Sequence, residues 1–82
     1  MTRKELETIV KRGLAGIAPE ADLEALDPGA DLRESLDLDS MDFLNFLVGL
    51  REETGIEVAD TDVPRVATLA GCLDYLCARA IR

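Results

Sequence analysis

The sequence contains no histidine and no tryptophan, and it has one tyrosine and two phenylalanines among 82 residues. Without histidine, neither a Ser-His nor a Cys-His nucleophile pair can form, and a zinc site would need other ligands. A chain of this length buries only about 60 to 65% of its unfolded surface, which leaves no room for a deep cleft. We therefore expect a single domain over residues 1–82 that is not an enzyme and holds no metal.

Cysteine and long apolar runs are also scarce. Cys72 and Cys77 lie five residues apart in a segment with a helical pattern, so their side chains point about 140° apart and cannot readily bridge. We expect free thiols in a reducing compartment, in preference to a redox or metal role. Met1 to Glu5 are followed by no long apolar run, which predicts neither a secretion signal nor a membrane span. The expected location is the cytoplasm.

Positive charge is in short supply, with nine Lys and Arg against seventeen Asp and Glu and a net charge of −8. Residues 18–62 hold fourteen of the acids and two of the bases, whereas both flanking segments are mildly basic. This charge repels nucleic acid and anionic lipid surfaces, and it would steer the chain toward partners that carry Lys and Arg patches. Charge alone supports solubility equally well as an explanation.

Apolar residues at helical spacing predict three long helices and one short one, with no strand. The first long helix runs from about Thr2 to Ala18 and the second from Asp39 or Ser40 to about Glu53, where Gly55 supplies a left-handed cap. A short third helix follows around residues 63–66, and Thr68 caps the last. Residues 19–38 are predicted to form a long connection without regular structure, pinned to the core by leucines, namely Leu23, Leu26, Leu32 and Leu36. The predicted fold is an all-α four-helix bundle.

The second predicted helix has more apolar residues than one core face requires. At 100° per residue, a first arc holds Phe43, Phe46, Leu47 and Leu50. A second arc of Met41, Leu44 and Val48 lies beside Ser40. The second arc either closes against another helix or stays exposed for a partner or a cargo chain.

The entrance of this helix carries one hydroxyl among acids, in the run Leu36-Asp37-Leu38-Asp39-Ser40-Met41-Asp42. Asp39 is expected to cap the helix by accepting from the backbone N–H of residue 41 or 42. Ser40 would then be the first helical residue, with its side chain free to leave the surface. The alternative is that Ser40 itself caps the helix and does nothing else, since serine is a preferred cap.

Five features of the sequence together resemble acyl carrier proteins. They are the motif Asp39-Ser40-Met41, its Leu-Asp-Leu-Asp lead-in, the run Asp42 to Leu47, the pair Glu52-Glu53 and the Val63 to Leu76 block. The resemblance covers most of the chain. It implies a 4'-phosphopantetheine arm on Ser40, attached by a phosphopantetheinyl transferase. In that reaction the serine hydroxyl attacks coenzyme A, and the transferase supplies the metal and the base. The chain would then be a carrier, and Ser35, outside the helix entrance, would stay unmodified.

In that family the helix after the serine is the surface that partner enzymes read. The resemblance therefore predicts a partner-binding set on this helix, namely Asp39, Met41, Asp42, Leu44, Val48 and Glu52. The expected partners are the transferase, an acyl- or aminoacyl-loading ligase and downstream acyl-using enzymes. We expect a monomer that binds no nucleic acid.

The sequence departs from carriers of fatty-acid synthesis at several positions. Those proteins often have glycine and a small residue where this chain has Asp37 and Leu38, and acids where it has Asn45 and Arg51. These changes favour a specialised discrete carrier in fatty-acid, lipid or specialised-metabolite biosynthesis. A freestanding aminoacyl or peptidyl carrier, loaded by a dedicated ligase, is the alternative. A small acidic adaptor that binds through Met41, Leu44 and Val48 without a prosthetic group is a further one.

Overall fold

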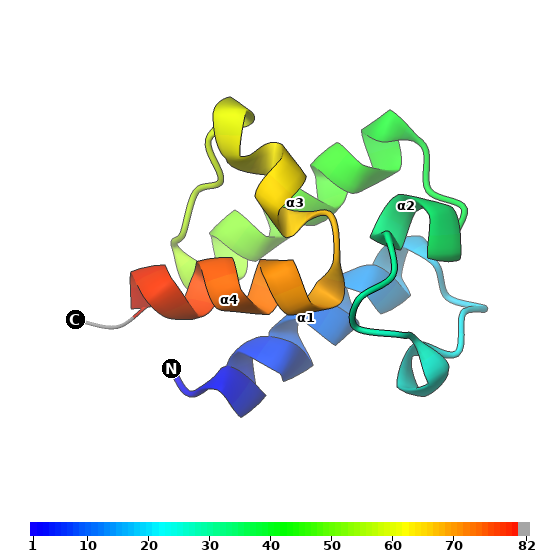
Figure 1. The fold of residues 1–82 in the computed structure, drawn as a ribbon, viewed down its shortest axis with the longest axis horizontal. Helices are drawn as coiled ribbons and strands as arrows, with labels where there is room; N and C mark the ends of the chain where they lie inside the picture. Colours follow the sequence, from blue (N-terminus) through cyan, green and yellow to red (C-terminus); the bar gives the residue numbers. More distant parts are fainter. Residues whose placement is uncertain (81–82) are drawn as a thin grey trace.

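Three long helices form the frame of the molecule in the computed structural model, which describes residues 1–80. They are α1 (Arg3–Ile17), α3 (Ser40–Thr54) and α4 (Leu69–Ala80). Both α3 and α4 pack against α1, and α4 runs back along it, so that the start of α1 and the end of α4 lie at the same end of the molecule (Figure 1). The predicted all-α fold is confirmed for the described residues.

The ends of the long helices are set by local chemistry. At the start of α1, the Thr2 hydroxyl accepts from the Glu5 backbone N–H and the Glu5 carboxylate accepts from the Thr2 N–H, which is a capping box. Gly55 ends α3 with φ of 74°, as predicted for a left-handed cap. Thr68 caps α4, because its hydroxyl accepts from the Gly71 N–H at 3.0 Å.

The segment between α1 and α3 is more ordered than predicted. It holds a short 3₁₀ helix, η1 (Leu23–Ala25), and a single turn of α-helix, α2 (Leu32–Ser35). The prediction that residues 19–38 lack regular structure was therefore wrong. The reason is tertiary: the Leu32 N–H donates to the Ala67 carbonyl at 2.7 Å and the Ala70 N–H donates to the Pro28 carbonyl at 2.9 Å, which ties this segment to the start of α4.

The short third helix exists as η2 (Asp60–Val66), a 3₁₀ helix that packs on α4. Asp62 in η2 accepts a hydrogen bond from the buried Tyr75 hydroxyl at 2.9 Å, and the Arg79 guanidinium stacks on the Tyr75 ring at 3.6 Å. Burial and the nearby Asp62 carboxylate raise the pKa of Tyr75. These contacts fix η2 to α4.

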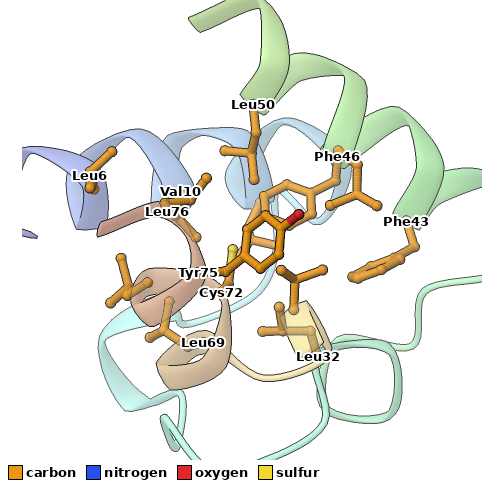
Figure 2. Close-up of a cluster of buried hydrophobic side chains, with 14 of the residues drawn as sticks. Leu6, Val10, Leu32, Phe43, Phe46, Leu50, Leu69, Cys72, Tyr75 and Leu76 are labelled. Atoms are coloured by element: carbon orange, nitrogen blue, oxygen red, sulfur yellow. The ribbon is translucent and has the colours of Figure 1, made fainter. Parts of the chain in front are cut away.

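A single apolar core fills the space between the helices (Figure 2). Its fully buried members come from five elements and include Leu14, Leu32, Phe46, Leu50, Val66 and Leu76. The predicted core arc of α3 is confirmed, because Phe43, Phe46, Leu47 and Leu50 are all buried. The predicted leucine anchors of the connection are confirmed too: Leu32 is buried, and Leu23, Leu26 and Leu36 pack against the core.

Both cysteines are free thiols, as predicted. Cys72 is fully buried in the core, and burial raises the pKa of its thiol to about 12. Cys77 is half-buried at the edge, where the Arg3 guanidinium approaches its sulfur at 3.9 Å. No helix in residues 1–80 has both the length and the apolar character that a membrane crossing requires.

Candidate functional site at the start of α3

The first turn of α3 has the predicted cap. Asp39 adopts extended backbone geometry, and its carboxylate accepts from the Asp42 N–H at 2.8 Å. The Asp39 carbonyl accepts the first helical hydrogen bond, from the Phe43 N–H at 3.1 Å. Ser40 is therefore the first residue of the helix, as predicted, and it does not serve as the cap.

The Ser40 side chain is exposed, and its hydroxyl forms a hydrogen bond with a residue that was not predicted to be part of the site. The Arg33 guanidinium donates to Ser40 Oγ, with Nη2 at 3.0 Å from the oxygen. Arg33 belongs to α2, the helical turn that was predicted as loop. Arg33 and Ser40 are seven residues apart in the sequence, and this spacing does not predict a contact between them unless α2 is known.

Three features hold α2 beside the serine. The Asp31 carboxylate caps α2 by accepting from the N–H groups of Arg33 and Glu34 at 2.9 and 3.1 Å. Leu32 is fully buried, and the Leu38 N–H donates to the Arg33 carbonyl at 2.9 Å. The backbone that carries Arg33 is thus fixed to both the core and the approach to α3.

Asp37 explains one of the departures from the usual carrier sequence. It has φ of 54°, and it is the non-glycine residue with positive φ in the described chain. Glycine adopts this left-handed conformation without steric cost, and aspartate is among the few other residues that tolerate it. The turn before Ser40 therefore has a left-handed residue at Asp37, the position where the resemblance to carriers predicts glycine.

An apolar surface continues from Ser40 along α3. Met41, Leu44 and Val48 have 65%, 51% and 55% of their surface exposed, so the second apolar arc is exposed rather than closed against another helix. Leu44 and Val48 form one wall of a shallow groove of about 170 Å³ between α3 and the η2 region. The other residues that line it are Leu47, Arg51, Glu57, Val58, Asp60 and Val63.

The predicted acidic residues separate into two places. Asp39 and Asp42 flank Ser40 at the start of α3. Glu52 lies about 18 Å further along the helix by its rise of 1.5 Å per residue, and it borders a different depression, between α1 and α3. All six predicted partner residues lie on or beside one helix, with Asp39, Met41 and Asp42 next to Ser40 and Glu52 distant from it.

The arrangement presents a hydroxyl and does not activate it. Ser40 is contacted by a guanidinium, which donates hydrogen bonds and accepts no proton near neutral pH. Neither thiol lies at this site: Cys72 is buried in the core, where burial raises the pKa of its thiol to about 12, and Cys77 is half-buried on α4. Among the side-chain hydrogen bonds of residues 1–80, the one at Ser40 Oγ comes from the Arg33 guanidinium, and no carboxylate bonds to this hydroxyl.

The same surroundings fit a phosphodiester on Ser40. The first N–H groups of a helix have no acceptor within the helix, and the helix dipole favours an anion at this end. Asp39 already occupies the Asp42 N–H, which leaves the N–H groups of the very first turn and the Arg33 guanidinium on the side of the serine. An exposed oxygen with these donors beside it fits the phosphate of 4'-phosphopantetheine.

Comparison with known proteins identifies the family. A family model described as "Phosphopantetheine attachment site" matches residues 6–76. Acyl carrier proteins from Thermosynechococcus vestitus and Rubrobacter xylanophilus are 33% and 31% identical over 55 residues, which cover 67% of this chain and 68% of each relative. The acyl carrier protein of Nitratidesulfovibrio vulgaris is 30% identical over 53 residues, 65% of this chain and 70% of its own.

The fold agrees with these relatives. The solution structure of a protein described as an acyl carrier protein from Anaplasma phagocytophilum superposes with a TM-score of 0.85, over 98% of this chain and 93% of that one, at 23% identity. The chain belongs to the acyl carrier protein family, whose members are non-catalytic carriers with a covalently attached 4'-phosphopantetheine group.

Proposed function

We propose that Ser40 is the residue that carries the 4'-phosphopantetheine arm. The observation that carries this proposal is the position of its exposed hydroxyl at the first residue of a 15-residue helix, behind the Asp39 cap. Ser35 is the other serine of the chain and is also exposed, but it ends the single turn α2. Exposure alone therefore does not distinguish the two serines, whereas the helix entrance does.

In the proposed modification, Ser40 Oγ forms a bond to the β-phosphorus of coenzyme A. The phosphoanhydride bond breaks, adenosine 3',5'-bisphosphate leaves, and the hydroxyl proton passes to a base of the transferase. Arg33 and the first-turn N–H groups of α3 are the groups of this chain that would face the resulting phosphodiester. When bound, the arm supplies a thiol that holds cargo as a thioester.

The surface beside Ser40 is proposed to bind the transferase and the enzymes that load or use the cargo. Asp39 and Asp42 offer carboxylates, and within residues 1–80 no ion pair occupies them. Met41, Leu44 and Val48 supply exposed apolar area next to these charges. Basic side chains around a partner's entrance would be guided by the acids and then pack on the apolar residues. Glu52 would contact a partner that extends along α3.

The cargo is proposed to be an acyl group. The groove between α3 and η2 begins at Leu44, and five of its eight lining residues are apolar, which would suit a hydrocarbon chain; Arg51, Glu57 and Asp60 line the remainder. An aminoacyl cargo is the alternative, and the free thiols Cys72 and Cys77 play no part in either case. The domain is proposed to act as a monomer in fatty-acid, lipid or specialised-metabolite biosynthesis, a role that the family match over residues 6–76 supports. The proposed location is the cytoplasm, which the free thiols support.

Intact-mass measurement tests the attachment site. The chain, incubated with coenzyme A, Mg²⁺ and a broad-specificity phosphopantetheinyl transferase, should gain one phosphopantetheine. Ser40→Ala should gain none, whereas Ser35→Ala should gain one as the parent does. A parent chain that gains no mass would leave the acidic-adaptor function as the better account, and a modified Ser40→Ala would move the arm to another residue.

The cargo requires a second measurement. The holo protein isolated from its native host is trapped before the thioester hydrolyses, and the mass of the intact species is compared with that of the free holo form. A fatty or other carboxylic acyl group is the expected increment. An amino acid increment would refute the acyl cargo and support loading by a dedicated aminoacyl ligase.

A further inference from the structure

The guanidinium of Arg33 stands out among the basic groups of this chain. Its Nη2 lies 3.0 Å from Ser40 Oγ, and within residues 1–80 it forms no ion pair with a carboxylate, although Glu34 and Asp37 are close in sequence. Five other bases are paired with carboxylates, namely Arg3, Lys11, Arg12, Arg65 and Arg79. The charge of Arg33 is therefore available at the serine.

The position of Arg33 is built into the fold. Asp31 caps the turn that bears it, buried Leu32 anchors that turn in the core, and the Leu38 N–H binds the Arg33 carbonyl. A side chain on a free loop would reach Ser40 only at the entropic cost of ordering the loop. Here the backbone is already ordered, so only the side chain itself must be held.

The groups around Ser40 are negatively charged, and a guanidinium beside them would offset their repulsion. Asp39 and Asp42 place two carboxylates at the start of α3, and a phosphodiester on Ser40 adds a third negative group. The repulsion among them opposes the attraction of the helix end. A guanidinium matches the planar fork of two phosphate oxygens, and such charge-assisted pairs are shorter and stronger than neutral hydrogen bonds.

We propose that Arg33 binds the phosphodiester once the arm is attached to Ser40, and so holds the root of the arm on the α2 side of the helix entrance. This inference rests on the proposed attachment at Ser40. The oxygen that Arg33 now contacts becomes the ester oxygen, so the phosphate is bonded to an atom already within its reach. Arg33 is then a positioning residue of the holo protein, and it takes no part in the transfer.

Phosphorus NMR of the holo protein tests the proposal. The samples are the parent, Arg33→Gln, Arg33→Lys and the control Lys4→Gln, each modified to completion as judged by intact mass. Lys4→Gln makes the same change of net charge in the first turn of α1, at the opposite end of the molecule from α2 (Figure 1). The phosphodiester resonance should shift in Arg33→Gln, shift less in Arg33→Lys, which retains the charge but loses the fork, and stay at the parent position in Lys4→Gln.

Two further readouts separate phosphate binding from a merely structural role. Raising the salt concentration should move the parent resonance toward that of Arg33→Gln, because exposed ion pairs are screened. Attachment of the arm should stabilise the parent more than Arg33→Gln, by a factor of about 1.4 to 5 in the unfolding equilibrium constant, which is the range for an exposed ion pair. The apo forms provide the reference for each variant.

The outcomes are distinct. A parent chain that takes no phosphopantetheine would refute the proposed function, and this inference with it. A modified parent whose phosphorus resonance is the same as that of Arg33→Gln would overturn the role of Arg33 alone. Faster modification of Arg33→Gln with an unshifted resonance would overturn it too, and would show that Arg33 shields the hydroxyl in the apo protein.

Discussion

The Asp39 cap allows the structural and the recognition roles of one carboxylate to be separated. Asp39 accepts a hydrogen bond from the Asp42 N–H at 2.8 Å, and asparagine caps helices about as well as aspartate whereas alanine does not cap. Asp39→Asn therefore removes the charge and keeps the cap, and Asp39→Ala removes both. The structure predicts different orders for stability and for recognition.

The expected loss of stability in Asp39→Ala is about 1 kcal/mol, within a range of about 0.5 to 2 for such caps. Loss of the charge at the positive end of α3 accounts for about 0.3 to 1 kcal/mol in an exposed position. For a domain of this size, 1 kcal/mol corresponds to a decrease in Tm of about 4 to 8 °C. Asp39→Asn should lose only the charge part, so its stability should lie between the parent and Asp39→Ala.

Urea unfolding followed by far-UV circular dichroism measures the stability of the apo forms, and the kcat/KM of the transferase toward each apo form measures recognition. We expect kcat/KM to fall in both variants, since both lose the charge that guides a basic partner. Equal stabilities of Asp39→Asn and Asp39→Ala would refute the cap as a hydrogen bond. An unchanged kcat/KM in Asp39→Asn would refute the role of the charge in docking.

Two other positions give independent predictions. The pKa of Cys72, about 12 against an ordinary 9.0, means that the folded state holds this proton more tightly than the unfolded state. The Cys72 contribution to stability should therefore be complete below pH 9 and fall by about 1.4 kcal/mol per pH unit between pH 9 and about 12. In urea unfolding between pH 8 and 11, Cys72→Ala should lose this part of the slope and keep the part due to Tyr75, whose pKa is also raised. Cys77→Ala should keep both parts, and a slope unchanged in Cys72→Ala would contradict the burial argument. At Asp37, where φ is 54°, Asp37→Val should lower the free energy of unfolding by about 1 to 2 kcal/mol, while Asp37→Gly should equal or slightly exceed the parent; a glycine variant less stable than the valine variant would contradict the left-handed turn.

The sequence was sufficient for α3 because several local signals agree there. Asp39 supplies a cap, Gly55 supplies a left-handed end, and the apolar residues between them divide into a buried and an exposed arc. Each signal arises from residues near one another in the chain. The position of Ser40 at the first residue of the helix follows from these signals, so it was predictable.

The Arg33 contact was not predictable in the same way. A four-residue helix has too few residues for a periodic pattern, and α2 depends on the bond of Leu32 to Ala67, which lies 35 positions further along the chain. The proximity of Arg33 to Ser40 depends in turn on α2. A local sequence pattern does not include the distant residue whose hydrogen bond stabilises α2, so this helical turn could not be predicted from the pattern.

The bonds that join α2 to the start of α4 have a consequence for protein engineering. The Leu32 N–H donates to the Ala67 carbonyl and the Ala70 N–H donates to the Pro28 carbonyl. A chimera that imports one of these segments without the other therefore separates residues that are hydrogen-bonded in this structure. The surroundings of Ser40 are therefore formed by two separated stretches of the chain, and both must be transferred together.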